Sequence, residues 1–190
     1  MNKKRICIYC SSSNYLPEKF YKVAEEFGTK LAENNYDMVY GGTTVGMMGV
    51  IANNALNNGA DVIGVIPQRI ESCGLKHPKL AKVIVTKDMR ERKATMENLG
   101  DVFVAAPGGF GTFEEIFEIL VAKQLGYHKK PVIFFNFDNY YSNLLKMFDT
   151  VYENNFAKDE MKQLYYVANS VDSIFSYIAS YQPKEFVHKW

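Results

Sequence analysis

The sequence predicts a single α/β domain built on a doubly wound parallel sheet with helices on both faces. Two observations lead to this prediction. Along the 190 residues, short apolar runs alternate with longer segments whose apolar residues recur at helical spacing. Two of the apolar runs end in glycine-rich turns, at 41–49 and 107–111, that lead into helices. The sequence contains no internal repeat, low-complexity tract or linker, so we expect one domain over residues 1–190.

The first two predicted strands are each followed by a helix. A buried apolar strand at 5–10 runs into a polar loop, and the helix at 17–34 carries its apolar residues on one face. A second strand at 37–40 ends in the glycine-rich turn 41–49. We expect Gly59 to end the helix that follows, because glycine readily takes the left-handed conformation after a C-cap.

The middle of the chain is less regular. A third strand covers 61–66, and the segment 67–80 after it has neither a helical nor a strand pattern. Irregular segments of this length often act as lids or binding loops. A short fourth strand at 83–86 precedes a helix at 87–99, whose charged residues, judged by spacing alone, favour a solvent-facing surface with i,i+4 ion pairs.

The turn after the fifth strand, 102–106, is the centre of the prediction. Its glycines remove Cβ atoms where a ligand could approach, and a helix start offers free N–H groups and the positive end of a dipole. Such a turn is a ready site for an anion, most naturally a phosphate. We expect Thr112 to be the N-cap of the next helix, with Glu115 at N3 completing a capping box.

The last third of the chain continues the alternation. We expect a strand at 130–135, an aromatic-rich helix at 139–154, a short strand at 165–167 and a helix at 171–180. The tail at 183–190 is expected to pack on the body or on a partner subunit. Strands that alternate with helices throughout imply a Rossmann-like topology.

Two familiar phosphate-binding motifs are missing from the sequence. The third glycine of a dinucleotide fingerprint is replaced by Glu114, and no Gly-x-x-x-x-Gly-Lys-Ser/Thr occurs. Two carboxylates beside a phosphate-binding turn instead suggest chemistry on the sugar that carries the phosphate. Cys7 and Cys10 are expected to face opposite sides of a strand and have no second pair at zinc-ligand spacing, so small core residues are expected there.

Composition restricts the partners. The 22 basic and 21 acidic residues leave a net charge of +1, so there is no global field to recruit nucleic acid or a membrane. The apolar stretch near the N-terminus is too short for a signal peptide, and no run reaches membrane-spanning length. We therefore expect a cytoplasmic protein, and three cysteines argue against a disulfide framework.

Some residues of the predicted loops have two possible interpretations. The hydroxyls from Ser11 onward could reach a ligand or could cap the next helix. Gly46 and Gly49 could serve a ligand or could let a helix pack tightly on the sheet. Gly41 and Gly42, at the strand end, are the better ligand candidates.

Three segments together resemble one family. They are Gly41-Gly42-x-x-x-Gly46-Met47-Met48-Gly49, Met89-x-x-Arg92-Lys93 and Pro107-Gly108-Gly109-x-Gly111-Thr112-x-Glu114-Glu115. Over about residues 5–154 the chain is similar to the LONELY GUY family, the cytokinin riboside 5′-monophosphate phosphoribohydrolases, long labelled possible lysine decarboxylases. The resemblance implies a nucleotide-binding domain that hydrolyses the N-glycosidic bond of a nucleoside 5′-monophosphate.

The resemblance also implies roles for single residues. Arg92 and Glu115 would be the catalytic pair, which reverses the solvent-facing reading of Arg92 and Lys93. The implied substrate-binding residues are Met89, Lys93, Gly108, Gly109, Phe110, Gly111, Thr112, Phe113, Glu114, Gly41, Gly42 and Ser11. The 5′-phosphate would lie on the N–H groups of Gly109, Gly111 and Thr112. The family further implies a homodimer, and the chemistry needs neither a metal nor another cofactor.

Physical chemistry is compatible with these implied roles. Cleavage of the bond to the base develops positive charge on the ribose, which a carboxylate would stabilise. We expect the helix dipole to keep Glu115 ionised, because the capping box would put it in the first turn. Arg92 does not readily give up a proton, so it is expected to act as an electrostatic partner.

Two departures from the family pattern leave the base preference open, between adenine and an N6-prenylated adenine. Thr43 stands where the family usually has a third glycine, and Arg69 falls near a position where plant relatives carry a glutamate.

Two other functions are considered. A carrier of a nucleotide or of the molybdenum cofactor would share the fold, but the presence of both Arg92 and Glu115 counts against it. A pyridoxal-phosphate lysine decarboxylase would need a Schiff-base lysine with supporting partners, and none is identified in the sequence.

Overall fold

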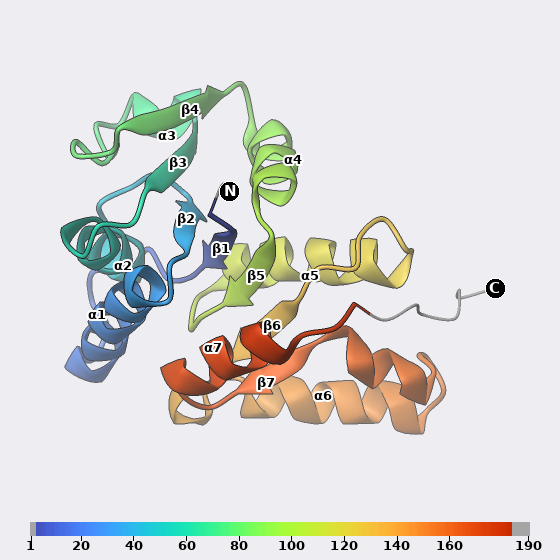
Figure 1. Ribbon diagram of the computed structural model, residues 1–190. Coiled ribbons are helices and arrows are strands. Elements are labelled where there is room, and N and C mark those ends of the chain that lie inside the picture. The colour runs from blue at the N-terminus through green and yellow to red at the C-terminus, as the bar shows by residue number, and fades with distance from the viewer. Residues whose placement is uncertain (1–2, 184–190) are drawn as a thin grey trace.

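Seven parallel strands form one sheet in the computed structural model, which describes residues 3–183. The strands are β1 Arg5–Tyr9, β2 Asp37–Tyr40, β3 Val62–Pro67, β4 Lys82–Thr86, β5 Val102–Ala105, β6 Val132–Phe135 and β7 Tyr166–Ala168. Their order in the sheet is β4-β3-β2-β1-β5-β6-β7, and each neighbouring pair is parallel. The direction of winding reverses between β1 and β5, so the predicted doubly wound fold is confirmed (Figure 1).

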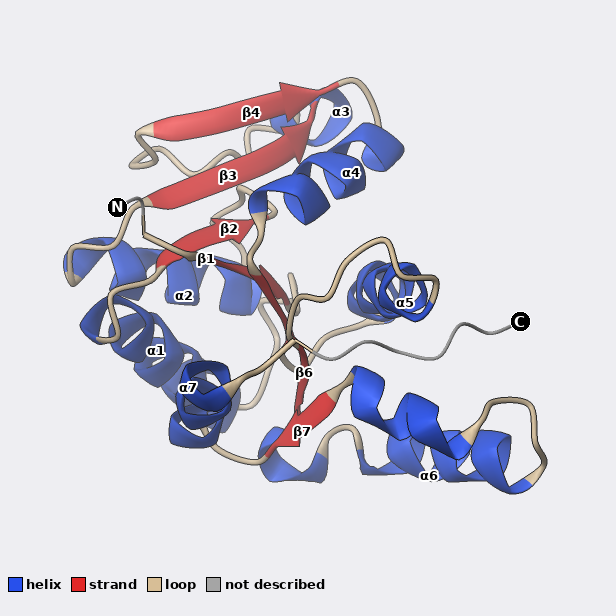
Figure 2. Cartoon of the chain, turned by 45° about the vertical axis from the view of Figure 1, so that its right-hand side comes forward, coloured by secondary structure: helices blue, strands red, loops and turns tan. Residues whose placement is uncertain are grey.

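Helices cover both faces of this sheet. They are α1 Glu18–Glu33, α2 Gly46–Asn57, α3 Gln68–Glu71, α4 Met89–Leu99, α5 Phe110–Gln124, α6 Ser142–Glu153 and α7 Val171–Ser180, with 3-10 turns η1 Phe137–Asn139 and η2 Asp159–Leu164. Figure 2 shows α1, α2 and α7 on one side of the sheet and α4, α5 and α6 on the other. The molecule therefore has three layers, and each face of the sheet has its own core.

Strand β1 shows how the two cores are divided. Ile6 and Ile8 belong to the core under α1, α2 and α7, whereas Cys7 and Tyr9 belong to the core under α4 to α6. Successive side chains of a strand point to opposite faces, so an apolar run without polar interruptions is what a strand buried on both faces requires. The expectation that Cys7 and Cys10 face opposite sides is also confirmed, since Cys10 packs in the first core.

Local sequence rules explain several helix ends. Gly59 has φ +86° and follows the C-cap of α2 as predicted, and the N–H of Ala60 donates to the carbonyl of Ala55 at 3.0 Å, which closes the helix. Asp88 caps α4 by accepting from the N–H of Glu91 at 2.9 Å.

The predicted start of α5 was wrong. The N-cap is Gly109 and the helix begins at Phe110, so Thr112 is its third residue and Glu115 its sixth. The carbonyl of Gly109 already accepts the N–H of Phe113 at 3.1 Å, which closes the first helical turn ahead of the position expected from Thr112. Thr112 and Glu115 form no capping box, because both residues lie within the helix and neither is its N-cap.

Two other predicted segments differ from the structure. The irregular segment 67–80 contains the short helix α3, and it is attached to the strand-β2 loop through a bridge between Thr43 and Lys76. The helix expected at 139–154 begins only at Ser142, because Asp138 and Asn139 take left-handed φ values of 53° and 59°. The predicted packing of the tail at 183–190 falls, except for Pro183, on residues that lie outside the described part of the chain.

None of the helices described between residues 3 and 183 combines the length and the apolar character needed to cross a bilayer.

Candidate active site

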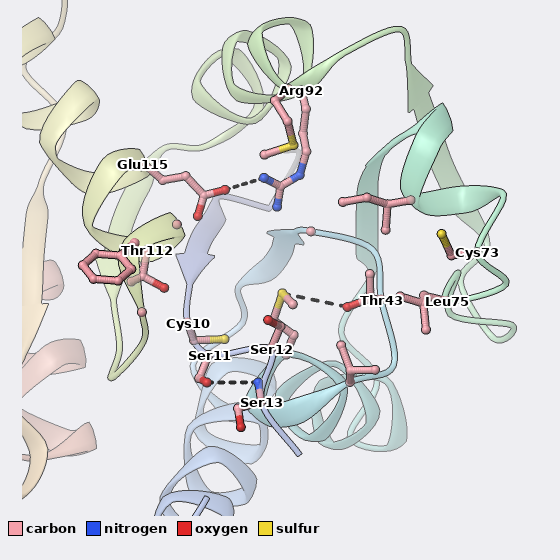
Figure 3. Close-up of a pocket in the computed structure, with 18 residues that line it drawn as sticks. Cys10, Ser11, Ser12, Ser13, Thr43, Cys73, Leu75, Arg92, Thr112 and Glu115 are labelled. Atoms are coloured by element: carbon pink, nitrogen blue, oxygen red, sulfur yellow. Dashed lines mark hydrogen bonds and ion pairs between the residues drawn. The ribbon is translucent and has the colours of Figure 1, made fainter. Parts of the chain in front are cut away.

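A pocket of about 690 Å³ opens at the carboxyl edge of the sheet. The loop after β1, the loop after β2 and the turn between β5 and α5 all contribute to its lining, as Figure 3 shows. The order of the strands reverses between β1 and β5, and ligands of open α/β sheets bind in the crevice at such a point. Its place in the fold and its size fit a small-molecule site.

An ion pair between two helices lies in this pocket. Arg92 on α4 and Glu115 on α5 point toward one another in Figure 3, and Arg92 Nη1 donates to Glu115 Oε1. Each residue is 8% exposed. Arg92 Nε also donates to the carbonyl of Val65 at 3.1 Å, so the guanidinium is held from both the sheet and α5.

Gly41 makes room for this arginine. A Cβ at position 41 would lie 2.5 Å from Arg92 Nη2, so it would displace the guanidinium that Glu115 and Val65 hold in place. The absence of a side chain at Gly41 therefore has a structural reason. Gly41 also lines the pocket, so it remains a ligand candidate.

The group that favours ionisation of Glu115 differs from the sequence-based expectation. Burial raises its pKa above the usual value, and the guanidinium of Arg92 opposes that rise. The expected effect of the helix dipole is small, since it weakens beyond the first turn and Glu115 is the sixth residue of α5. Glu115 is thus a buried carboxylate whose ionisation depends chiefly on its neighbour Arg92.

The start of α5 presents its backbone to the pocket. The N–H groups of Phe110, Gly111 and Thr112 precede the first intrahelical donor, Phe113, so they are groups that a helix cannot pair internally. A Cβ at Gly109 or Gly111 would meet nothing within 4 Å, so open space surrounds both positions. These features make the turn accessible to an anion.

The start of α2 is different. The N–H of Gly46 donates to Asn14 Oδ1 at 2.8 Å, and a Cβ at Gly46 would lie 2.6 Å from the carbonyl oxygen of Ser11. Gly46 therefore serves tight packing, but against the backbone of the loop after β1 and not against the sheet as expected. Ser11 does not cap α1, whose N-cap is Pro17; its Oγ accepts the N–H of Ser13 at 3.1 Å within the loop.

Most of the predicted site residues meet in one place. Those that line the pocket are Ser11, Gly41, Met89, Arg92, Gly109, Phe110, Gly111, Thr112 and Glu115. Five others do not line it. Lys93 pairs with Glu114 and Glu118 between α4 and α5, and Phe113 packs toward Tyr141 in the core. Gly42 accepts from the N–H of His77, and Gly108 borders a smaller neighbouring pocket.

Nine other residues line the pocket besides the predicted site residues. They are Cys10, Ser12, Ser13, Thr43, Val45, Met48, Ile70, Cys73 and Leu75. Three of them come from the segment 67–80, which the sequence had indicated as a possible binding loop by its length and irregularity. This segment forms an apolar wall that faces the helix start across the pocket.

The described residues offer no metal site, because no three His, Cys, Asp or Glu side chains in the range 3–183 are grouped for it. Burial raises the pKa of the Cys7 thiol to about 12, so this thiol stays protonated and inert.

Comparisons with known proteins agree with the motifs. The family model described as "Possible lysine decarboxylase" matches residues 48–178. A cytokinin riboside 5′-monophosphate phosphoribohydrolase of Arabidopsis thaliana is 37% identical over 181 residues, covering 95% of this chain and 85% of the relative. A probable enzyme of the same name from Oryza sativa is 36% identical, covering 95% and 72%.

Solved structures share the fold. A molybdenum cofactor binding protein from Rippkaea orientalis superposes with a TM-score of 0.73 at 22% identity, over 95% of this chain and 98% of the other. A molybdenum cofactor carrier protein from Chlamydomonas reinhardtii gives 0.72 at 22% identity, over 94% and 96%. At such low identity the likeness concerns the fold alone. The family-model match and the plant relatives together show that this chain belongs to the cytokinin riboside 5′-monophosphate phosphoribohydrolase family.

Proposed function

We propose that this protein hydrolyses the N-glycosidic bond of purine nucleoside 5′-monophosphates, AMP or N6-modified cytokinin ribotides, to a free base and ribose 5-phosphate. The observation that carries the proposal is one pocket in which the buried Arg92–Glu115 pair lies with the open helix start at Gly109 to Thr112. The names of the plant relatives point to the same reaction.

Glu115 is the group suited to the reacting sugar. As the C1′–N bond breaks, its electrons leave with the base nitrogen, which takes up a proton, and positive charge develops on the ribose. A largely buried carboxylate stabilises that charge or orients the attacking water, whose oxygen joins C1′. Arg92 keeps this carboxylate ionised and in place through Nη1, while Val65 holds the other side of the guanidinium.

The rest of the pocket suits the other parts of a nucleotide. The 5′-phosphate would accept hydrogen bonds from the first-turn N–H groups of α5, with the helix dipole adding attraction. Val45, Met48, Ile70 and Leu75 offer an apolar wall for a purine and for an apolar N6 substituent. No lysine is among the described residues that line the pocket, which argues against a Schiff-base decarboxylase.

We further propose that the enzyme works in the cytoplasm as a homodimer, on a small-molecule substrate and without a bound cofactor. Exposed apolar side chains at Val121 on α5 and Met147 on α6 support a subunit contact on that face of the sheet. Light scattering would give twice the 21.7 kDa of one chain for a dimer; a mass of one chain at working concentration would exclude it.

The test of the reaction is direct. Purified protein is incubated with AMP and with isopentenyladenosine monophosphate, and the free base is followed by chromatography. We expect base release by the wild type and a fall of roughly 100-fold or more in kcat for Glu115→Gln, which keeps the shape of the side chain but loses its charge. The ratio of the two wild-type rates measures the base preference.

A specific result would reject the hydrolase. Tight binding of nucleoside monophosphates without any released base, across purines and pyrimidines, would mean that the protein is a carrier.

A further inference from the structure

Tyr140 contacts the turn between β5 and α5 and lines a smaller pocket beside the main one. Its hydroxyl donates to the carbonyl of Gly108, and the next residue, Tyr141, donates through its hydroxyl to the carbonyl of Ala106 at 2.8 Å. Between them, the carbonyl of Pro107 accepts the N–H of Ser11 at 3.0 Å. Three consecutive carbonyls of the turn are therefore held by donors from other parts of the chain.

The geometry of the peptide unit links these contacts to the pocket. In a trans peptide the C=O and the following N–H point in opposite directions. When Tyr140 holds the Gly108 carbonyl, the N–H of Gly109 is directed away from the Tyr140 hydroxyl, and Gly109 lines the main pocket as well as the smaller one beside it. Tyr140 itself is not among the residues that line the main pocket; it borders the smaller neighbouring one.

Contacts of the segment between β6 and α6 fix the positions of Tyr140 and Tyr141. Asn136, 7% exposed, accepts the N–H of Tyr141 on Oδ1 at 2.7 Å. Asp138 and Asn139 then take left-handed φ values of 53° and 59°, an uncommon conformation for residues other than glycine, and Asp138 pairs with Lys19 of α1. Backbone strain of this kind persists where the surrounding contacts enforce it, often beside a functional site.

We propose that Tyr140 is a positioning residue for phosphate recognition, which aims the Gly109 N–H at the substrate phosphate through the Gly108 carbonyl. This rests on the proposed function for the identity of the substrate. Tyr140 suits a test better than Tyr141, because Tyr140 is 41% exposed whereas Tyr141 is 1% exposed and packs against Phe113 and Phe134.

The experiment compares Tyr140→Phe with a matched control, Tyr181→Phe. Tyr181 also donates its hydroxyl to a backbone carbonyl, that of Lys129 at 2.8 Å, but it borders a different pocket at the other end of the sheet. Binding is measured by calorimetry with ribose 5-phosphate, which the proposed reaction does not consume, and kcat and KM are measured with AMP.

We expect Tyr140→Phe to raise the dissociation constant for ribose 5-phosphate, and the KM for AMP, by about 3- to 10-fold, the effect of one hydrogen bond. The phenylalanine ring should keep the contact with Phe20, so the local packing is retained. The value of kcat should stay within about twofold of the wild type, because Tyr140 touches no reacting atom. Tyr181→Phe should bind as the wild type does. A thermal midpoint within about 4 °C of the wild type would show that Tyr140→Phe is folded.

Unchanged affinity in Tyr140→Phe, or an equal loss in Tyr181→Phe, would overturn the inference. The two proposals fail separately. If the wild type binds ribose 5-phosphate but releases no base from AMP, the proposed hydrolase function is rejected. The affinities of the two variants still test the role of Tyr140. A wild type that binds neither ribose 5-phosphate nor AMP would overturn both.

Discussion

Arg92 and Glu115 are two buried charges that depend on each other. Removing one partner of such a pair leaves the other without compensation in a site of low polarity. Glu115 has little other support, because burial works against its ionisation and Arg92 is the main group that works for it. The pair is therefore a sensitive point for both stability and activity.

Arg92→Met should lower both. We expect the free energy of unfolding at neutral pH to fall by on the order of 3 kcal/mol, because a buried carboxylate loses its partner. The pKa of Glu115 should rise further, so the acid limb of kcat/KM should move to higher pH than in the wild type. Urea denaturation and a pH–rate profile measure the two effects.

Arg90→Met is the matched control, since Arg90 is an exposed arginine on the same helix. Its stability should stay within about 0.5 kcal/mol of the wild type. If Arg92→Met were equally harmless, or left the acid limb where it was, the pair would not hold the charge of Glu115.

At the scale of elements, the glycines of the turn before α5 and of its first turn serve two different purposes. Gly111 has open space around it, so nothing in the protein forbids a side chain there. Gly108 is required by the fold itself, because a Cβ at that position would lie 2.1 Å from Thr112 Oγ1. The same residue type thus leaves space for the proposed ligand at one position and is needed for packing at the other.

Alanine separates the two purposes. Gly111→Ala should stabilise the protein by about 0.4–1 kcal/mol, because alanine favours the helix, yet should raise the KM for AMP at least about tenfold by obstructing the phosphate. Gly108→Ala should lower the thermal midpoint instead. Thermal unfolding and steady-state kinetics of both variants test this; a Gly111→Ala enzyme with wild-type KM would mean that the phosphate does not approach the helix start.

The whole molecule should lose stability in acid partly through His128. Burial lowers its pKa from the usual 6.5 to about 4, although its Nε2 contacts the carbonyl of Ile119. Between these two pH values His128 is protonated in the unfolded chain but stays neutral in the folded chain. The free energy of unfolding therefore falls as pH drops from 6.5 toward 4.

His128→Asn should flatten this part of the pH dependence. Because the side chain is only partly buried, we expect a contribution on the order of 1 kcal/mol across the window. Denaturation midpoints at several pH values from 7 to 4 measure it. Parallel curves for the variant and the wild type would assign the acid sensitivity to other groups.

Local patterns in the sequence were sufficient for the strands and the longer helices, although not for the short helix α3 or for the starts of α5 and α6. The seven strands, the parallel sheet and the end of α2 at Gly59 were all predicted, because apolar runs, helical periodicity and glycine turns depend on neighbouring residues. The motif around 107–115 likewise indicated a phosphate-binding turn before any contact was known, and the resemblance supplied its partner Arg92.

Contacts between segments that are distant in the sequence were decided only by the tertiary structure. Arg92 and Glu115 lie on different helices, and the carbonyl of Val65 that holds the arginine comes from a third element. The apolar wall from 67–80 and the hydroxyl of Tyr140 at the turn follow no local periodicity. The burial that raises the pKa of Glu115 also arises only in the packed structure, because it depends on which segments exclude water from the carboxylate.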